Sequence, residues 1–296
     1  MEQQDNDKRV AAPAELVSGA VRLVSLPEVC LRVNEMLDDP NTSAADFGRV
    51  ISQDTGLTAR LLKIVNSAFY GFPSRIETVS RAVAVIGLRE LRGLVLAASA
   101  VETFSRIPND VLNMVRFWRH SVYCGVVSKL LAERCHVLHS ERLFVAGLLH
   151  DIGKLIICHR LPELARTAQR RIGEMQGFDF EIEQELMGFD HAEVGGELLD
   201  HWRMPQSLVN AVRYHHAPRS ATDNLIEVAL VHIANAMTGL AEQSLDVDVD
   251  MLIQPADPNA WEMVGLDPSV MDPVFTDAAD QFVEALNMIL PNHLPR

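Results

Sequence analysis

The stretch that decides the fold is LLHDIGKL, at residues 148–155. It places two polar side chains, His150 and Asp151, inside an apolar run with helical periodicity that extends from Ser140 to about Arg160. Segments on either side have the same periodicity, whereas the alternation of apolar and polar residues that is typical of strands is almost absent. The chain is therefore predicted to be all-α, with a helix that carries a histidine and an aspartate near its middle.

Further helices are expected on both sides of this stretch, with ends marked by capping residues and glycines. Ser43 and Asp46 have the spacing of a capping box, and Gly87 separates two helices. A glycine-containing segment from Gly173 to Gly188 is expected to be a link, and residues 246–257 an acidic loop. One expected helix begins near Pro27, and another runs through His120 to about Arg134. Two more run from His191 to about Trp202 and from Pro205 to His215–His216. The remaining expected helices cover 78–86, 88–104, 229–241 and 275–290.

The composition limits the classes of function. The 296 residues are enough for one large domain or two ordinary ones, and a net charge of −14 argues against a general nucleic-acid binder, because contact with phosphates needs a positive surface. No apolar run approaches the roughly 18 residues of a membrane-spanning helix, and the first residues resemble no signal peptide. The four cysteines form no CxxC pair, which fits a reducing compartment. A cytoplasmic protein without membrane partners is expected.

Six side chains on separate predicted helices are candidate metal ligands. Imidazole and carboxylate groups bind iron, manganese and zinc in proteins, so we expect one or two divalent ions. A single buried histidine is more often a core residue than a ligand, but an ordered set on several helices favours one shared site. Lys154, one turn after His150, is the candidate contact for a bound phosphate. The six candidate ligands are His120, His150, Asp151, His191, His215 and His216.

These ligands resemble those of the HD superfamily of phosphohydrolases, and the HDxGK pattern at 150–154 is similar to that of the HD-GYP phosphodiesterases. Four N-terminal stretches resemble instead the HDOD domain, the HD-related output domain of bacterial signalling. They are LP at 26–27, ISQD at 51–54, LLKIVNSAFYG at 61–71 and RAVAVIGL at 81–88. The resemblance covers about 18–240. It implies a flexible N-terminus at 1–15, an N-terminal helical lobe at 16–107, an HD-like helical lobe at 108–241, and a C-terminal loop and helix at 242–296 that pack on the domain.

The chain also departs from the pattern of active HD enzymes at three places. Asn235 stands where the last aspartate ligand is expected, and an amide is a poorer ligand than a carboxylate. Arg116 stands where HD-GYP enzymes carry an acidic residue, and a cation there would repel a second metal ion. The GYP loop is absent after His215–His216. The resemblance therefore does not imply hydrolysis of cyclic dinucleotides.

Three functions follow from these patterns. The first is a signalling output or scaffold module that acts through contacts with signalling proteins, without catalysis, and retains a metal site. The alternative is a metal-dependent phosphohydrolase or phosphodiesterase in which Lys154 contacts the phosphate. The third is a metal or redox sensor. The sequence determines neither the partner, nor the upstream signal, nor the metal, nor the oligomeric state.

Overall fold

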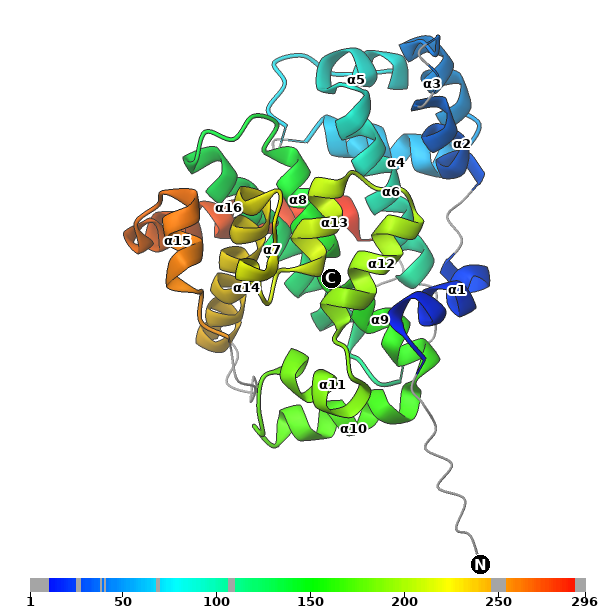
Figure 1. Ribbon diagram of the computed structural model, residues 1–296. Coiled ribbons are helices and arrows are strands. Elements are labelled where there is room, and N and C mark those ends of the chain that lie inside the picture. The colour runs from blue at the N-terminus through cyan, green and yellow to red at the C-terminus, as the bar shows by residue number, and fades with distance from the viewer. Residues whose placement is uncertain are drawn as a thin grey trace, which may run out of the picture.

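Helix α7 (Met114–Arg134) lies at the centre of the molecule, and other helices pack around it (Figure 1). Its segment Cys124–Ala132 is buried throughout. Helices α8 (Glu141–Leu149), α14 (Leu225–Leu245) and α16 (Met271–Ile289) all pack against it. Helix α7 is therefore the axis around which the C-terminal two thirds of the chain is arranged.

The computed structural model describes residues 11–24, 28–37, 39, 41–67, 70–105, 110–245 and 254–290. No strand occurs in these ranges, and the all-α prediction is confirmed. The remaining α-helices are α1 (Pro13–Val24), α2 (Glu28–Leu37), α3 (Ala44–Ile51), α4 (Thr55–Val65), α5 (Val79–Ile86), α6 (Leu88–Ser105), α9 (Ile152–Arg160), α10 (Pro162–Gly173), α11 (Asp179–Met187), α12 (His191–His201), α13 (Gln206–Arg213) and α15 (Pro258–Val264).

Some predictions fall on residues that the structure does not describe. The helix start at Pro27, the lobe boundary at 107 and most of the expected loop at 246–257 lie outside the described residues. Residues 1–10 of the expected flexible N-terminus also lie outside them, whereas helix α1 already begins at Pro13. The division into lobes stays a prediction.

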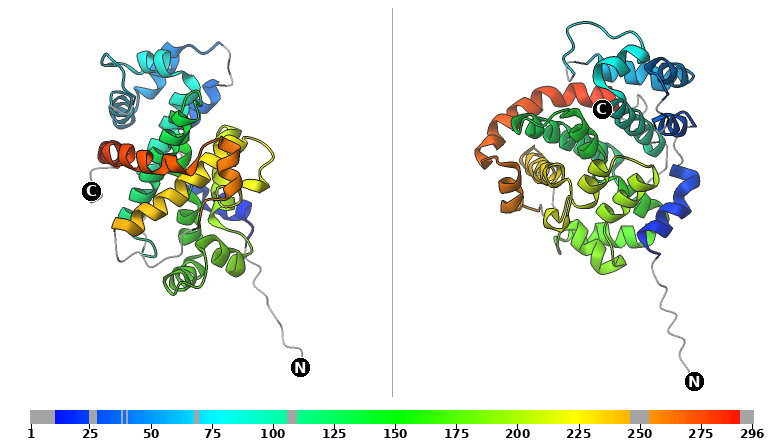
Figure 2. Two further views of the ribbon diagram at one scale, coloured as in Figure 1. Left: turned by 90° about the vertical axis from the view of Figure 1, so that its left-hand side faces the viewer. Right: turned by 45° about the horizontal axis from the view of Figure 1, so that its top comes forward.

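The N-terminal helices α2–α5 gather at one end of the molecule, and α6 runs from them towards α8 (Figures 1 and 2). Helix α1 packs instead on α9 and α12, far from α3 and α5 in both views. One continuous apolar core includes side chains from α1 through to α16. The first and the last described helices therefore belong to one packed structure.

Short-range signals in the sequence set several helix ends. At the start of α3, Ser43 N donates to Asp46 Oδ2 over 3.0 Å and Asp46 N donates to Ser43 Oγ over 3.3 Å, so the predicted capping box is confirmed. Gly87 separates α5 from α6 with a φ of 88°, a value that side chains with a Cβ rarely adopt.

Helices α9 and α12 approach each other closely because glycines lie between them. A Cβ on Gly153 would lie 2.0 Å from the carbonyl oxygen of His191 and 2.7 Å from Gly195 N. A Cβ on Gly195 would lie 3.4 Å from Gly153 N and 2.9 Å from Val212 Cγ1 on α13. This contact brings the first turn of α9 against the first turn of α12, and with it the candidate ligands that these turns carry.

Helix α14 is the one described helix that is long and apolar enough to span a membrane, over Leu225–Gln243. The structure buries 61% of that segment against neighbouring helices, which is the usual position of a core helix in a folded domain.

Replacing Gly153 by alanine should lower the free energy of unfolding by about 1–3 kcal/mol or more, because the added Cβ meets backbone atoms that cannot move aside. Gly173→Ala is the matched control: no atom lies within 4 Å of a Cβ there, so we expect a change below about 1 kcal/mol, in the stabilising direction. Urea unfolding measures both. Equal stability of the two variants would contradict the packing described for α9 and α12.

Candidate metal centre

Five of the six predicted ligands converge at one buried point. Asp151 Oδ1 lies 3.0 Å from His191 Nε2, 3.5 Å from His150 Nε2 and 3.9 Å from His215 Nε2. His216 Nε2 lies 2.9 Å from His191 Nε2. All five residues are at most 8% exposed. Side chains from three separate segments of the chain therefore place their polar ends together in the core.

The backbone turns at the His150–Asp151 pair. The single helix predicted from Ser140 to about Arg160 is wrong at this point, because α8 ends at Leu149 and α9 begins at Ile152. Asp151 has φ −94° and ψ 5°, outside the helical values, and its side chain caps nothing. The break frees the carboxylate of Asp151 to point at the histidines, which it could not do with the same ease from the middle of a straight helix.

Each of the four central histidines donates its Nδ1 proton outwards. The acceptors are Gly147 O at 2.7 Å, Glu183 Oε2 at 2.6 Å, Val212 O at 2.7 Å and Gln254 Oε1 at 2.8 Å, for His150, His191, His215 and His216 in that order. These oxygens accept, so each Nδ1 carries a proton and each Nε2 points to the centre. Metal-binding histidines have this arrangement of outer partners.

Several lone pairs that face one another in the core need a cation between them. His150 Nε2 and His215 Nε2 are buried without a hydrogen bond in the described part of the chain. Ligand atoms of Asp151, His191, His215 and His216 lie within 4.8 Å of one another, close enough to hold one ion. Three imidazoles and a carboxylate suit iron, manganese or zinc. The cluster could therefore bind a divalent metal ion.

The electrostatics of the cluster supply a cation even before a metal binds. Burial lowers the pKa of His191, but the Glu183 carboxylate outweighs this effect and raises that pKa to about 10. Burial lowers the pKa of His150 and of His216 to about 4 each. His191 therefore holds a proton where the others stay neutral, and a metal ion has to replace that proton.

His120, the sixth predicted ligand, lies beside the cluster but is bound differently. Its Nε2 lies 3.1 Å from Asn235 Oδ1, and its Nδ1 lies 3.1 Å from Glu242 Oε2. Burial lowers the pKa of His120, and the Glu242 carboxylate reverses this and raises it. His120, His150 and Asp151 form a second group that could hold an ion, but both nitrogens of its outer histidine already face oxygen acceptors of the protein.

Lys154 is held between two carboxylates. Its Nζ lies 2.8 Å from Asp151 Oδ2 and 2.7 Å from Asp179 Oδ2, and the side chain is only 16% exposed. Burial lowers the pKa of this amine, but the two carboxylates outweigh it and raise the pKa. Lys154 thus fixes the orientation of Asp151, whose other oxygen faces the histidines.

Four residues that support the cluster were missed in the sequence. Asp179 and Glu183 lie on α11, inside the segment expected to be a link. Gln254 lies within the expected acidic loop, and Glu242 lies on α14 two turns after Asn235. A spacing of four residues between Asp179 and Glu183 places them on one helix face, and that is the only signal that could have indicated a joint role.

The far end of α12 contacts the N-terminal helices. Asn34 Nδ2 donates to the carbonyl oxygen of Trp202 over 2.9 Å, and Arg92 donates to that of Arg203. The ring of Trp202 lies 6.4 Å from that of Phe104 on α6. One rigid helix therefore has His191 at its first residue and contacts to α2 and α6 at its end.

A family model of the HDOD domain matches residues 23–218. The chain belongs to the HDOD domain family. This match confirms the resemblance found in the N-terminal motifs. It covers α2–α13 and the central part of the metal cluster, and it ends before the C-terminal helices α14–α16.

Solved structures share the fold of this HDOD chain. An HDOD domain protein of unknown function from Geobacter sulfurreducens has a TM-score of 0.70 at 24% identity, over 96% of this chain and 98% of that one. A presumed phosphohydrolase from Shewanella amazonensis SB2B has a TM-score of 0.69 at 22% identity, over 92% and 96% of the two chains. An uncharacterized protein from Treponema pallidum (strain Nichols) is 26% identical over 195 residues, 64% of this chain; the aligned part spans 37% of that relative's length.

Replacing Glu183 by glutamine should weaken metal binding by about 10–100-fold, because the carboxylate that orients His191 and receives its Nδ1 proton is lost. Glu185→Gln on the same helix is the control, because Glu185 pairs with Arg171 at the surface. Isothermal titration calorimetry of each purified variant with Mn²⁺ measures its affinity for the metal. If both variants bind as the original chain does, Glu183 does not position a ligand.

Proposed function

We propose that this HDOD domain is a signalling output module that holds one divalent metal ion and acts through contacts with other proteins, without hydrolysing phosphate esters. The observation that carries the proposal is the asymmetry of the cluster. The first set of ligand atoms, from Asp151, His191, His215 and His216, faces inwards, and its histidines have their outer partners in place. In the second set, from His120, His150 and Asp151, His120 is instead bound by Asn235 and Glu242.

The first set fits a single ion. Asp151, His191, His215 and His216 supply three neutral nitrogens and one carboxylate, and Glu183 and Gln254 fix two of the rings. When bound there, a divalent ion would neutralise the buried carboxylate and satisfy the facing lone pairs. Its binding energy would add directly to the stability of the folded chain.

The second set lacks what a two-ion hydrolase needs. Two-metal hydrolysis uses a pair of ions about 3.5–4 Å apart, one for each of the attacking and leaving oxygens. Asn235 provides a neutral amide in place of a carboxylate, and Glu242 forms an ion pair with His120. Arg116 lies one turn before His120 on α7 and adds a positive charge that acts on Glu242. The neutral amide of Asn235 and the positive charge of Arg116 disfavour a second cation, and the Glu242 carboxylate is already paired with His120.

Access also argues against turnover. The histidines at 150, 191 and 215 are 0% exposed, and Lys154, the candidate phosphate contact, is held by two carboxylates. A phosphodiester would have to open the core and break those ion pairs before it reached the metal. This supports a role for the ion in structure or signalling rather than in catalysis.

A metal-sensing role is the second candidate, and helix α12 favours it. The helix begins at the candidate ligand His191 and ends at His201, and Trp202, the next residue, contacts the N-terminal helices. Movement of His191 when the metal binds would be transmitted along α12 to α2 and α6. Such sensing would be a way of controlling the same output module.

The experiment is elemental analysis of protein purified without chelators or a metal-affinity column, combined with assays on phosphodiesters and cyclic dinucleotides. The original chain should carry one iron, manganese or zinc ion and show no turnover. His215→Ala should lose the ion, whereas His120→Ala, the control from the second set, should keep it. Two ions per chain, or turnover that disappears with the metal, would support the hydrolase instead.

The variant Asn235→Asp tests whether the neutral amide of Asn235 prevents the binding of a second ion. Restoring a carboxylate beside His120 should let the variant take up a second Mn²⁺ at high metal concentration, because the new charge attracts the cation. The spectroscopic check is the magnetic coupling between two neighbouring Mn²⁺ ions, which a single ion cannot give. If the variant stays at one ion, Asn235 is not the residue that prevents the second.

A further inference from the structure

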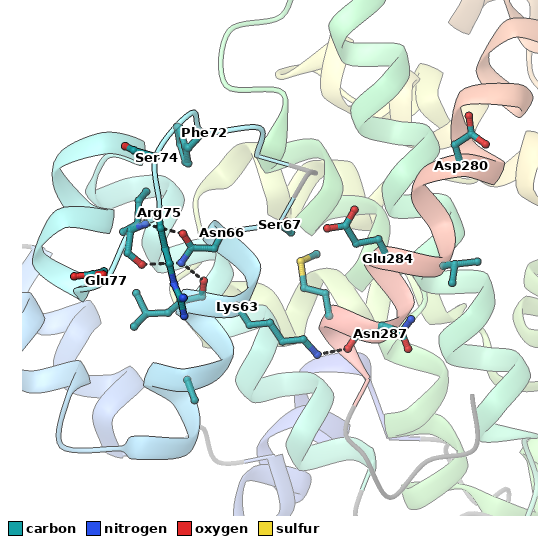
Figure 3. A pocket seen from close by; sticks show the side chains of 15 residues that line it. Lys63, Asn66, Ser67, Phe72, Ser74, Arg75, Glu77, Asp280, Glu284 and Asn287 are labelled. Carbon is teal, nitrogen blue, oxygen red and sulfur yellow. Dashed lines mark hydrogen bonds between the residues drawn. The ribbon is translucent and has the colours of Figure 1, made fainter.

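A groove of about 1370 Å³ lies between α4 with the segment that follows it and the C-terminal helix α16 (Figure 3). Its walls come from opposite ends of the sequence. Helix α4 belongs to the part that the HDOD family model matches, whereas α16 lies beyond the end of that match. The groove therefore lies between a helix inside the family match and a helix after its end.

Each wall of the groove is a stripe along a helix. Helix α4 contributes Ala59, Leu62, Lys63 and Asn66, and α16 contributes Asp280, Val283, Glu284 and Asn287. Both stripes have the i, i+3, i+4, i+7 spacing of one helix face, and each extends over about 11 Å. Two helix faces side by side are the shape into which a third helix packs.

Hydrogen bonds hold the groove in shape. Lys63 Nζ on α4 donates to the carbonyl oxygen of Asn287 on α16 over 2.5 Å, which joins the two walls. Asn66 Oδ1 accepts from Ile76 N at 2.6 Å, and Asn66 Nδ2 donates to Ile76 O at 2.7 Å, which fixes the segment after α4 (Figure 3). A ligand would thus meet a preformed surface and lose little free energy in ordering it.

The lining combines apolar side chains with charges of opposite sign on the two sides. Val283 is 61% exposed although Ala285 and Leu286, which follow it on α16, are buried, and Leu62 and Phe72 line the same space. Asp280 and Glu284 stand on the α16 side, and Lys63, Arg75 and Glu77, which together carry a net positive charge, stand on the other (Figure 3). An exposed apolar strip flanked by charged side chains is typical of a protein interface.

We infer that this groove binds an amphipathic α-helix of a partner protein. The apolar stripe of that helix contacts Val283 and Leu62, a row of Lys or Arg on one flank faces Asp280 and Glu284, and an acidic residue on the other flank faces Arg75. The net charge of −14 further attracts a partner with a basic flank. The inference rests on the interaction role proposed above, but it is independent of the metal.

The test is a selection from a display library of random peptides of about 16 residues, ~24 Å long as a helix, against the immobilised full chain. We expect the selected peptides to share apolar residues at helical spacing with Lys or Arg on one flank. Fluorescence anisotropy should show that Val283→Asp weakens their binding by at least about tenfold. Leu138→Asp, which alters an apolar residue that is 80% exposed and lies outside the groove lining, is the control and should bind unchanged.

A charge-reversal variant tests whether the basic flank of the bound helix faces α16. Asp280→Lys should weaken the basic-flank peptides, and peptides in which that flank carries Glu should bind this variant better than the original chain. If the selected peptides bind the Val283→Asp variant with the same affinity as the original chain, the groove is not their binding site. The proposed interaction with other proteins would not be contradicted by that result. No enrichment of helical peptides would also overturn the groove as a binding site, and the metal stoichiometry measured separately would still test the proposed function.

Discussion

The structure depends on a buried arrangement that is unfavourable unless a cation is present. Four imidazoles and one carboxylate lie together in the core, and the Nε2 atoms of the four rings face inwards because their Nδ1 protons are committed elsewhere. His191 Nε2 and His216 Nε2 lie 2.9 Å apart, and their lone pairs would repel unless a proton or a metal ion lies between them, because burial removes the water that would otherwise separate them. A proton on His191 relieves this repulsion in part, and a divalent ion would relieve it fully.

Much of the surrounding structure serves to bring these groups together. The glycines at 153 and 195 let α9 and α12 approach closely enough for Asp151 to reach His191. Helix α11 supplies both Asp179, which holds Lys154 against Asp151, and Glu183, which holds His191. Beyond the family match, Gln254 binds His216 through both its Nδ1 and its carbonyl oxygen. The segment after the family match thus contributes both to the cluster and, through α16, to the groove.

The sequence predicted the features that local patterns encode. Helical periodicity predicted the fold class and most helices, and residue type predicted the ligand set, because few other side chains bind metals. The break at His150–Asp151 was missed, since the apolar periodicity continues across it. Helix α11 was missed because its apolar face is short and its flanking glycines suggested a link. The roles of Glu183 and Gln254 depend on contacts between distant segments, which no local pattern shows.

The central claim is that the centre holds one ion, ligated by Asp151, His191, His215 and His216. The most direct measurement is anomalous X-ray diffraction from crystals of the chain loaded with Mn²⁺. The account predicts a single anomalous peak among the inward-facing atoms of these four side chains. A second peak between His120, His150 and Asp151, about 3.5–4 Å from the first, would contradict the account, and so would the absence of any peak at the centre.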